Sequence, residues 1–469
     1  MKTRIHILLV TLLLTSLACK TVTMAWQPRP ADTSVPTRQL TSTATLTPIP
    51  ASPTATATLA PTTTPSPRPS TPTATLTPSL SPTIRPTPSA LQLRVFDDLW
   101  QLVHDVYLYR NFNGLDWTAV HQEYHQKIVA GLTNVDFYAA MAEMIQRLGD
   151  NHSSFHNPSQ VKSINAQVSG KTDYAGIGVM TISVPERKRV SIIAVFPGSP
   201  AEAAGLQAHD SILEADGQPI LDENGFHHDL LVGKEGTTVT LIVQSPGQEP
   251  HQVTLTRQRI SESTPVPYQV IKTPQGKRVG YIQLLTLIDA TIGKQVGEAL
   301  KAMTAEGPLD GVILDNRMNP GGASTVFSET LSYFVNGSVG HFVNRQGSET
   351  VYIGGKDRNG SQKVPLVVLV GKNTASFGEI FSGVLKDLGR AYVIGETSPG
   401  IVEILYVYGF EDGSQAWIAH DTFRPVNHPT ETWEKTGIVP DLTVVSNWDQ
   451  VTMDTDPVIQ AALKHFDEK

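Results

Sequence analysis

The sequence predicts a multidomain protein in which a helical N-terminal subdomain, a small β-rich domain and an α/β core follow one another. Three observations predict this fold class. Apolar residues recur at helical spacing from Phe96 to Tyr107, short β-rich runs with turn residues fill 174–259, and strands alternate with helices from Val279 to Val445. The 469 residues are enough for roughly two or three domains.

The N-terminus has the pattern of an export signal over residues 1–18. Lys2 and Arg4 precede an apolar stretch too short to span a bilayer, and small residues follow it. Cys19, the only cysteine, comes next, and Leu-Thr-Ser-Leu-Ala-Cys resembles a bacterial lipobox, although Ser16 stands where an aliphatic residue is usual. We therefore expect lipidation of Cys19 and an anchor on the outer face of the cell membrane. The alternative is plain secretion with an unmodified cysteine.

Residues 19–90 are predicted to form a disordered linker rich in Thr and Pro. They hold 15 of the 33 prolines and no aromatic residue except Trp26. Such a composition buries too little apolar surface to offset the entropy of the chain. The linker is expected to hold the folded part away from the membrane.

Order is predicted to resume near Leu91. Asp116 and Asp136 are the expected N-caps of a second and a third helix, and the third helix is expected to end at Leu148, just before Gly149-Asp-Asn-His-Ser-Ser-Phe155. The folded part is predicted to divide into a helical subdomain (91–165), a β-rich domain (172–260), an α/β core (265–446) and a C-terminal segment (447–469).

The β-rich domain resembles a PDZ domain. Ala175-Gly-Ile-Gly-Val179 fits the carboxylate-binding loop of that family, and 197–206 and 210–217 fit the helix and strand that follow it. The resemblance implies that Gly176, Ile177, Gly178 and Val179 bind a polypeptide C-terminus while the peptide adds to the sheet edge. The alternative is a domain that serves only as a spacer.

Ser376 is the strongest candidate for a catalytic residue. It follows an apolar, strand-like stretch at 364–370 and precedes a helical stretch from Glu379 to Leu388. The first N–H groups of a helix have no helical partner and carry partial positive charge, so the Phe377 amide could stabilise an oxyanion created by attack of Ser376. Taken alone, a serine before a helix is more often only an N-cap.

A second motif, Leu314-Asp-Asn-Arg-Met-Asn-Pro-Gly-Gly322, ends a strand in a glycine pair that can bring N–H groups close to a ligand. The helical part, the PDZ-like domain, this motif, Thr-Ala-Ser-x-Gly-Glu, Gly-Glu-Thr and Gly-Ile-Val-Pro-Asp441 occur in one order. Over residues 95–446 the arrangement resembles the carboxy-terminal processing peptidases and their tricorn-type relatives. The resemblance implies a serine endopeptidase with a crotonase/ClpP-like ββα spiral core and Ser376 as nucleophile. It also implies an oxyanion hole from the Phe377 amide and one from Gly321 or Gly322.

The base that activates the serine is not the lysine of the processing peptidases. That lysine is expected about 25 residues after the serine, and Ile401 occupies its place in Gly395-Glu-Thr-Ser-Pro-Gly-Ile-Val-Glu403. Lys386 lies too far along the same helix, and Lys372 is expected to point to solvent.

The tricorn-type branch uses a histidine after the N-terminal helices and a glutamate near the final Gly-x-x-Pro-Asp. By this resemblance His152 is the base and Glu434 orients its ring. The chain departs from that branch in one respect, because Asn151 stands where a serine precedes the histidine; Ser153 could replace it. A purely structural His152, an ordinary surface Glu434, and His420 as base remain alternatives.

Other residues of these motifs are expected to be structural. Asp315 and Arg317 should fix their loop through bonds to backbone, and Glu379 should cap the nucleophile helix. No cluster of ligand spacing predicts a metal, and no cofactor motif is complete. The net charge of −8 without a basic block excludes nucleic acid as an expected partner.

Together these features predict an exported serine endopeptidase that cleaves unfolded or C-terminally exposed polypeptides, with recruitment by the PDZ domain. The alternative is a catalytically inactive protein on the same scaffold that binds peptides through its PDZ domain.

Overall fold

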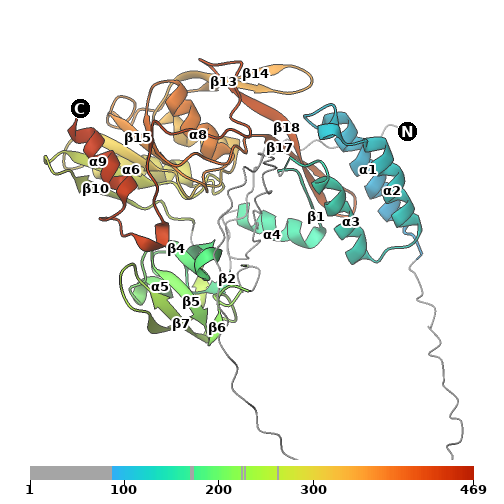
Figure 1. Ribbon diagram of the computed structural model, residues 1–469, viewed down its shortest axis with the longest axis horizontal. Coiled ribbons are helices and arrows are strands. Elements are labelled where there is room, and N and C mark those ends of the chain that lie inside the picture. Colours follow the sequence, from blue (N-terminus) through green and yellow to red (C-terminus); the bar gives the residue numbers. More distant parts are fainter. Residues whose placement is uncertain (1–86, 151, 169–173, 223–224, 226–228, 261–262) are drawn as a thin grey trace, which may run out of the picture. The chain divides into compact units, whose positions relative to one another are not determined.

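The computed structural model describes residues 87–150, 152–168, 174–222, 225, 229–260 and 263–469 (Figure 1). The predicted export signal, Cys19 and the linker up to residue 86 lie outside these residues, as does Asn151. Among the described residues, no helix combines the length and the apolar character that crossing a membrane requires.

Three helices begin the described chain, and each buries an apolar face. Side chains of Ser89, Asp116 and Thr133 cap them by accepting hydrogen bonds from backbone N–H groups. The predicted N-cap at Asp136 is wrong, because Thr133 Oγ accepts from Asp136 N and the carboxylate of Asp136 lies within the first turn. The helices are α1 (Ala90–Val106), α2 (Trp117–Val129) and α3 (Asn134–Gln146).

The helical part shares its hydrophobic core with the α/β part. Phe96, Tyr124 and Met141 belong to one buried cluster with Trp417 and Phe381. β1 (Ser154–His156) pairs antiparallel with β18 (Gln415–Pro425), which draws the end of the helical part into a sheet of the core. The sheet also holds β13 (Gly337–Val343), β14 (Ser348–Ile353) and β17 (Ile404–Gly409).

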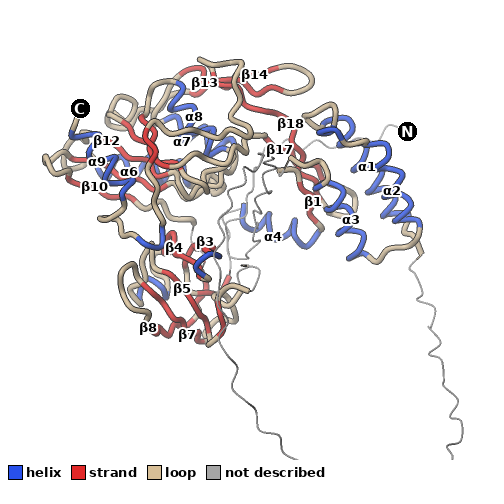
Figure 2. The backbone as a smooth tube through the Cα atoms, in the orientation of Figure 1, coloured by secondary structure: helices blue, strands red, loops and turns tan. Residues whose placement is uncertain are grey.

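The PDZ-like region has a hydrophobic core of its own, which includes Ile192, Leu241 and Val243. Its main sheet has the order β3-β4-β5-β7-β8, and these strands lie together in Figure 2. The elements after α4 (Pro158–Val168) are β2 (Tyr174–Gly176), β3 (Val179–Val184), β4 (Arg189–Val195), α5 (Pro200–Ala203), β5 (Ser211–Ala215), β6 (Gln218–Pro219), β7 (Thr238–Gln244), β8 (His251–Thr256) and β9 (Gln258–Ile260).

The central sheet has the order β10-β11-β12-β15-β16-β19, with only β10 antiparallel to its neighbour. The inner strands β12 and β15 are covered on both faces and read as nearly continuous apolar runs. The strands are β10 (Tyr268–Lys272), β11 (Arg278–Gln283), β12 (Gly311–Asp315), β15 (Leu366–Val370), β16 (Tyr392–Gly395) and β19 (Leu442–Thr443).

Successive residues of the central strands point to opposite faces of the sheet and therefore belong to two different hydrophobic clusters. Val312 and Leu314 pack with α6 (Ile292–Met303), α7 (Ser324–Ser332) and α8 (Phe377–Asp387). Ile313 packs with the C-terminal helix α9 (Pro457–Asp467), which therefore covers the second face of the sheet. Loops 315–322 and 371–376 follow the adjacent parallel strands β12 and β15 and therefore emerge at the same edge.

Candidate active site

Ser376 sits at the junction between the loop after β15 and the first turn of α8. Its backbone has φ 55° and ψ −128°, a conformation that is strained for any residue with a side chain. The residue is 1% exposed, and its Oγ makes no hydrogen bond to a described residue. The hydroxyl is therefore available for chemistry.

The glycine pair of the first loop lies against this turn. A Cβ built on Gly321 would be 2.7 Å from Ser376 Cβ and 3.0 Å from Phe377 N. Asn319 O accepts from Ala375 N at 3.0 Å, which fixes the two loops to each other.

The structure separates the two glycines that the sequence left as alternatives for the oxyanion hole. Gly321 N donates to Asn319 Oδ1 at 2.9 Å, so that this amide is already engaged. The N–H groups of Gly322 and Phe377 donate to no acceptor in the described part of the chain. The N–H groups of Gly322 and Phe377 are thus the two amides beside Ser376 that are free to donate. Gly321, which has no side chain, allows its loop to lie close to Ser376.

Glu379 does more than the capping that the sequence suggested. Its carboxylate accepts from Ser376 N at 3.3 Å, from Gly400 N and Ile401 N at 2.7 Å each, and from Ser398 Oγ. Burial raises the pKa of Glu379, and these donors act against that rise. Through these bonds Glu379 ties residues 398–401 to the turn that carries Ser376. Ser376 N adds a further link, because it donates to Ile401 O at 2.8 Å.

Neither candidate lysine faces the serine. Lys372 is 76% exposed and pairs with Glu396 at 3.0 Å. Lys386 pairs with Asp441 at 2.8 Å and donates to Val439 O. Ile401 itself contributes only backbone groups to the turn.

His152 is buried in the loop between α3 and β1. Asp150 Oδ1 accepts from His152 N at 2.9 Å and from Ser153 N at 2.7 Å. Ser153 Oγ donates to Asp150 and accepts from Ala419 N at 3.0 Å, which fastens the loop to β18. The sequence offers Ser153 as a replacement for the serine that precedes the histidine in the tricorn-type branch. In the structure its hydroxyl has a structural role instead, because it fastens the loop to β18.

The carboxylate beside His152 is Glu403, whose Oε2 lies 3.4 Å from the ring Nδ1. This corrects the predicted triad, in which Glu434 orients the ring. Glu434 lies beside the backbone of the same segment instead: its Oε2 accepts from Val402 N at 2.9 Å, and its carboxyl group interacts with that of Glu403. A charged residue inside the apolar run Val402-Glu-Ile-Leu405, two positions after the site of the missing lysine, was the available signal for Glu403.

Burial acts to raise the pKa of Glu403, but the His152 ring, the neighbouring Glu434 and the hydrogen bond from Tyr109 outweigh it and hold the pKa below its usual range. For Glu434, burial and then the negative charge of Glu403 raise the pKa to about 9.

Ser376 and His152 are held to the same short segment. Ser376 N bonds to Ile401 O, and His152 faces Glu403 two residues further on, roughly 7 Å along an extended chain. Both ring nitrogens of His152 and the hydroxyl of Ser376 lack a hydrogen-bond partner among the described residues. Such contacts are often long in unliganded hydrolases and tighten when substrate binds. His420, the alternative base, pairs with a different carboxylate, Asp421, at 2.9 Å.

The predicted carboxylate-binding loop, Gly176 to Val179, turns at Gly178, where φ is +78° and a Cβ would lie 2.3 Å from Ser199 Cβ. The carbonyl of Ile177 accepts from Ala201 N, and that of Gly178 accepts from Phe196 N. Gly176 forms an antiparallel bridge with Val232, whose pattern places Ile177 N opposite Leu231 O, whereas the N–H of Gly178 donates to no acceptor in the described ranges.

Arg317 ties the glycine-bearing loop to distant parts of the chain. Its guanidinium contacts the buried carboxylates of Asp315 and Asp456 at 2.6 Å each, and its charge lies 5.4 Å from the Trp448 ring. The prediction of a loop fixed by Asp315 and Arg317 is confirmed in kind, since Arg317 N donates to Asp315 Oδ1, but the stronger contacts are between side chains.

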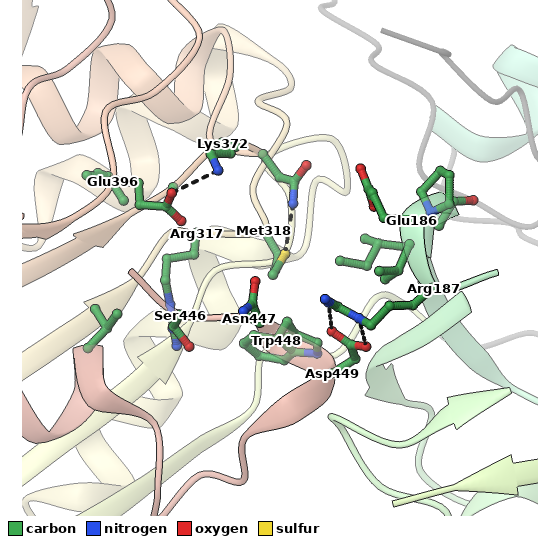
Figure 3. Close-up of a pocket in the computed structure, with 18 of the residues that line it drawn as sticks. Glu186, Arg187, Arg317, Met318, Lys372, Glu396, Ser446, Asn447, Trp448 and Asp449 are labelled. Carbon is green, nitrogen blue, oxygen red and sulfur yellow. Dashed lines mark hydrogen bonds and ion pairs between the residues drawn. The ribbon is translucent and has the colours of Figure 1, made fainter. Parts of the chain in front are cut away.

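A pocket of about 400 Å³ lies beside Arg317 (Figure 3). Its wall includes Arg187 from the hairpin between β3 and β4, which points to Asp449, and Lys372, which points to Glu396. Ser376, His152 and Glu403 do not line it. Among the described residues, no group of three or more His, Cys, Asp or Glu side chains is arranged to hold a metal ion.

Comparisons with known proteins agree with this architecture. Residues 278–444 match the family model "Peptidase family S41", residues 92–146 match "Tricorn protease C1 domain", and residues 175–255 match "PDZ domain". The carboxyl-terminal-processing protease of Synechocystis sp. is 33% identical over 390 residues, which cover 80% of this chain and 88% of the relative.

A protein of the same description from Picosynechococcus sp. is 32% identical, over 78% of this chain and 86% of the relative. The solved structure of a photosystem II D1 C-terminal processing protease aligns with a TM-score of 0.55 at 26% identity, and covers 80% of this chain and 97% of that chain.

Proposed function

The chain belongs to peptidase family S41 as a C-terminal processing serine peptidase with a PDZ domain and a tricorn C1 region, and on that premise we propose that Ser376, His152 and Glu403 carry out its hydrolysis. The observation that carries this proposal is the 3.4 Å contact between His152 Nδ1 and Glu403 Oε2, on the segment that also binds the backbone of Ser376. The crotonase/ClpP-like spiral remains a finer prediction, which the parallel β11-α6-β12 and β15-α8-β16 units support.

In this mechanism Ser376 Oγ attacks the scissile carbonyl while His152 Nε2 takes its proton, because Nδ1 faces Glu403. Glu403 stays ionised and stabilises the imidazolium. The oxyanion accepts hydrogen bonds from the N–H groups of Gly322 and Phe377. Collapse breaks the peptide bond, and His152 returns its proton to the leaving amine. Water then hydrolyses the ester on Ser376 with His152 again as base.

A fluorophosphonate probe tests the nucleophile directly. The wild-type protein is expected to form a covalent phosphonate adduct that mass spectrometry maps to Ser376, because only an activated serine beside an oxyanion hole displaces the fluoride. Ser376→Ala should carry no adduct, whereas Ser382→Ala, which removes a buried hydroxyl from the same helix, should be labelled like wild type. An adduct on another serine, or none at any pH, would remove Ser376 from this role.

For the substrates, we propose polypeptides with an exposed C-terminus, held by the loop Gly176 to Val179. The unengaged N–H group of Gly178 supports this assignment, because a carboxylate needs such donors.

A peptide substrate with a free C-terminus is therefore expected to have a KM roughly 10-fold below that of the same peptide with an amidated C-terminus. A ratio of about 10-fold corresponds to the free energy of one hydrogen bond to a charged group. Initial rates of both peptides measure this ratio. Equal KM values would indicate that the PDZ domain does not bind the C-terminal carboxylate and serves only as a spacer.

The N-terminal pattern supports a location outside the cytoplasm, with a lipid on Cys19 as membrane anchor. Mass spectrometry of the mature N-terminus checks it, and a mature chain that starts elsewhere and carries no lipid would contradict the anchor.

A further inference from the structure

Two carboxyl groups share one buried site behind the proposed base. Glu403 is 1% exposed and Glu434 is half-buried. Glu434 Oε2 accepts at 2.9 Å from the N–H of Val402, which directly precedes Glu403, so the two carboxyl groups interact although they lie 31 positions apart in the sequence. Two carboxylates in contact, away from water, cannot both stay ionised at neutral pH, because the repulsion of like charges adds to the cost of desolvation. One proton must therefore reside on this pair.

The neighbours of the two groups decide where that proton resides. Glu403 faces donors: its Oε1 accepts from Tyr109 OH at 2.8 Å, and its Oε2 faces His152 Nδ1 at 3.4 Å. These contacts favour the ionised form of Glu403.

Glu434 has a different environment. Apart from the backbone N–H of Val402, it faces the negative charges of Glu403 and Glu379. Of the pair, Glu434 is the member whose charge nothing compensates.

We propose that Glu434 is a positioning residue that keeps its proton at neutral pH and donates it in a hydrogen bond to Glu403, so that one ionised carboxylate faces His152. The inference rests on the proposed function, because it concerns how Glu403 is held for His152. Glu434 touches no reacting atom. It acts from two sides, since its O–H holds the carboxylate of Glu403 and its Oε2 holds the N–H of the preceding residue, Val402.

The charged and titratable groups around Glu434 give the sign of the pH dependence. Glu403 and Glu379 oppose its ionisation, Tyr109 and His152 contact Glu403, and Asp150 lies next to Tyr109 and His152. Below about pH 9 Glu434 is neutral, and above that value it loses the proton and repels Glu403. The activity of the wild type is therefore expected to fall with a limb near pH 9.

Glu434→Gln tests the inference because an amide keeps both hydrogen bonds and cannot ionise. We expect kcat/KM at pH 7.5 within about 3-fold of wild type and no limb near pH 9, since the Gln NH₂ replaces the O–H as a neutral donor. Glu434→Ala removes the donor to a charged group and should lower kcat/KM roughly 10- to 100-fold. Glu403→Gln should lower it by about 10³- to 10⁴-fold. Glu431→Gln, which changes an exposed glutamate of the same loop, is the matched control and should match wild type throughout.

The result that overturns the inference is a Glu434→Gln variant as impaired as Glu403→Gln, or one that keeps the alkaline limb of the wild type. A second readout does not depend on activity. Infrared difference spectra of wild type and Glu434→Gln at pH 7 should contain the C=O stretch of a protonated carboxyl group that only the wild type has. Absence of that band would refute the protonated Glu434 even in an inactive protein, whereas a failed probe reaction with the band present would count only against the proposed function.

Discussion

Replacing His152 by alanine is expected to lower kcat/KM by roughly 10⁴-fold or more, because Ser376 then has no group that takes its proton. Neither Lys372 nor Lys386 can substitute, since both pair with carboxylates elsewhere. Stability should change much less than activity, because neither ring nitrogen of His152 makes a hydrogen bond to a described residue. Rates of peptide cleavage, together with thermal unfolding of the same preparations, measure both effects.

The matched control is His156→Ala, which removes another largely buried histidine four residues along the same segment. His156 lies on β1 with its ring centroid 5.0 Å from that of Trp417, and burial lowers its pKa to about 4. It should retain activity within a few-fold of wild type. If His152→Ala kept more than a tenth of the wild-type rate, the base would have to be another group, and His420→Ala would be the variant to measure next.

The largest effect on stability is expected from Arg317→Met, at about 3–5 kcal/mol of unfolding free energy, which is typical of breaking a buried ion pair from one side. The substitution leaves Asp315 and Asp456 buried without their cation; their exposed fractions are 1% and 0%. Urea denaturation monitored by circular dichroism measures the loss. Arg94→Met, which breaks an exposed pair with Glu411, is the control and should leave the midpoint almost unchanged.

The effect of Arg317→Met should also depend on pH. In the wild type, burial acts to raise the pKa of Asp315, but Arg317 outweighs it and the pKa lies below its usual value. This group stabilises the fold above its unfolded pKa, and the contribution is lost as pH falls through the lower, folded pKa. Without the guanidinium the largest opposition to burial is gone, although Tyr281 OH and the backbone N–H of residue 317 still donate to Asp315. The pKa of Asp315 therefore rises, and the penalty shrinks when its carboxyl group takes up a proton. A loss near pH 4 as large as that at pH 7, or a loss under about 1 kcal/mol at pH 7, would contradict this account.

Much of the fold could be predicted because its signals are local. The apolar runs of β12 and β15 and the spacing of α1 follow from periodicity within a few turns of chain. The boundary of α3 could not be placed as well, because Thr133 and Asp136 both suit an N-cap and only the geometry of the turn selects Thr133.

The sequence by itself determined the types and the order of the groups that chemistry needs: a serine before a helix, a glycine pair after a strand, a histidine after the N-terminal helices, and no lysine at position 401. Tertiary structure alone decided which of two glycines keeps its amide free, and which of two glutamates meets His152. Asn319 engages Gly321, and the pairing of β1 with β18 brings His152 to Glu403 across 251 positions, with Glu434 behind. The physical reason is that a side chain's partner depends on how separate loops close on one another, and long-range closure leaves no periodic signal in the chain.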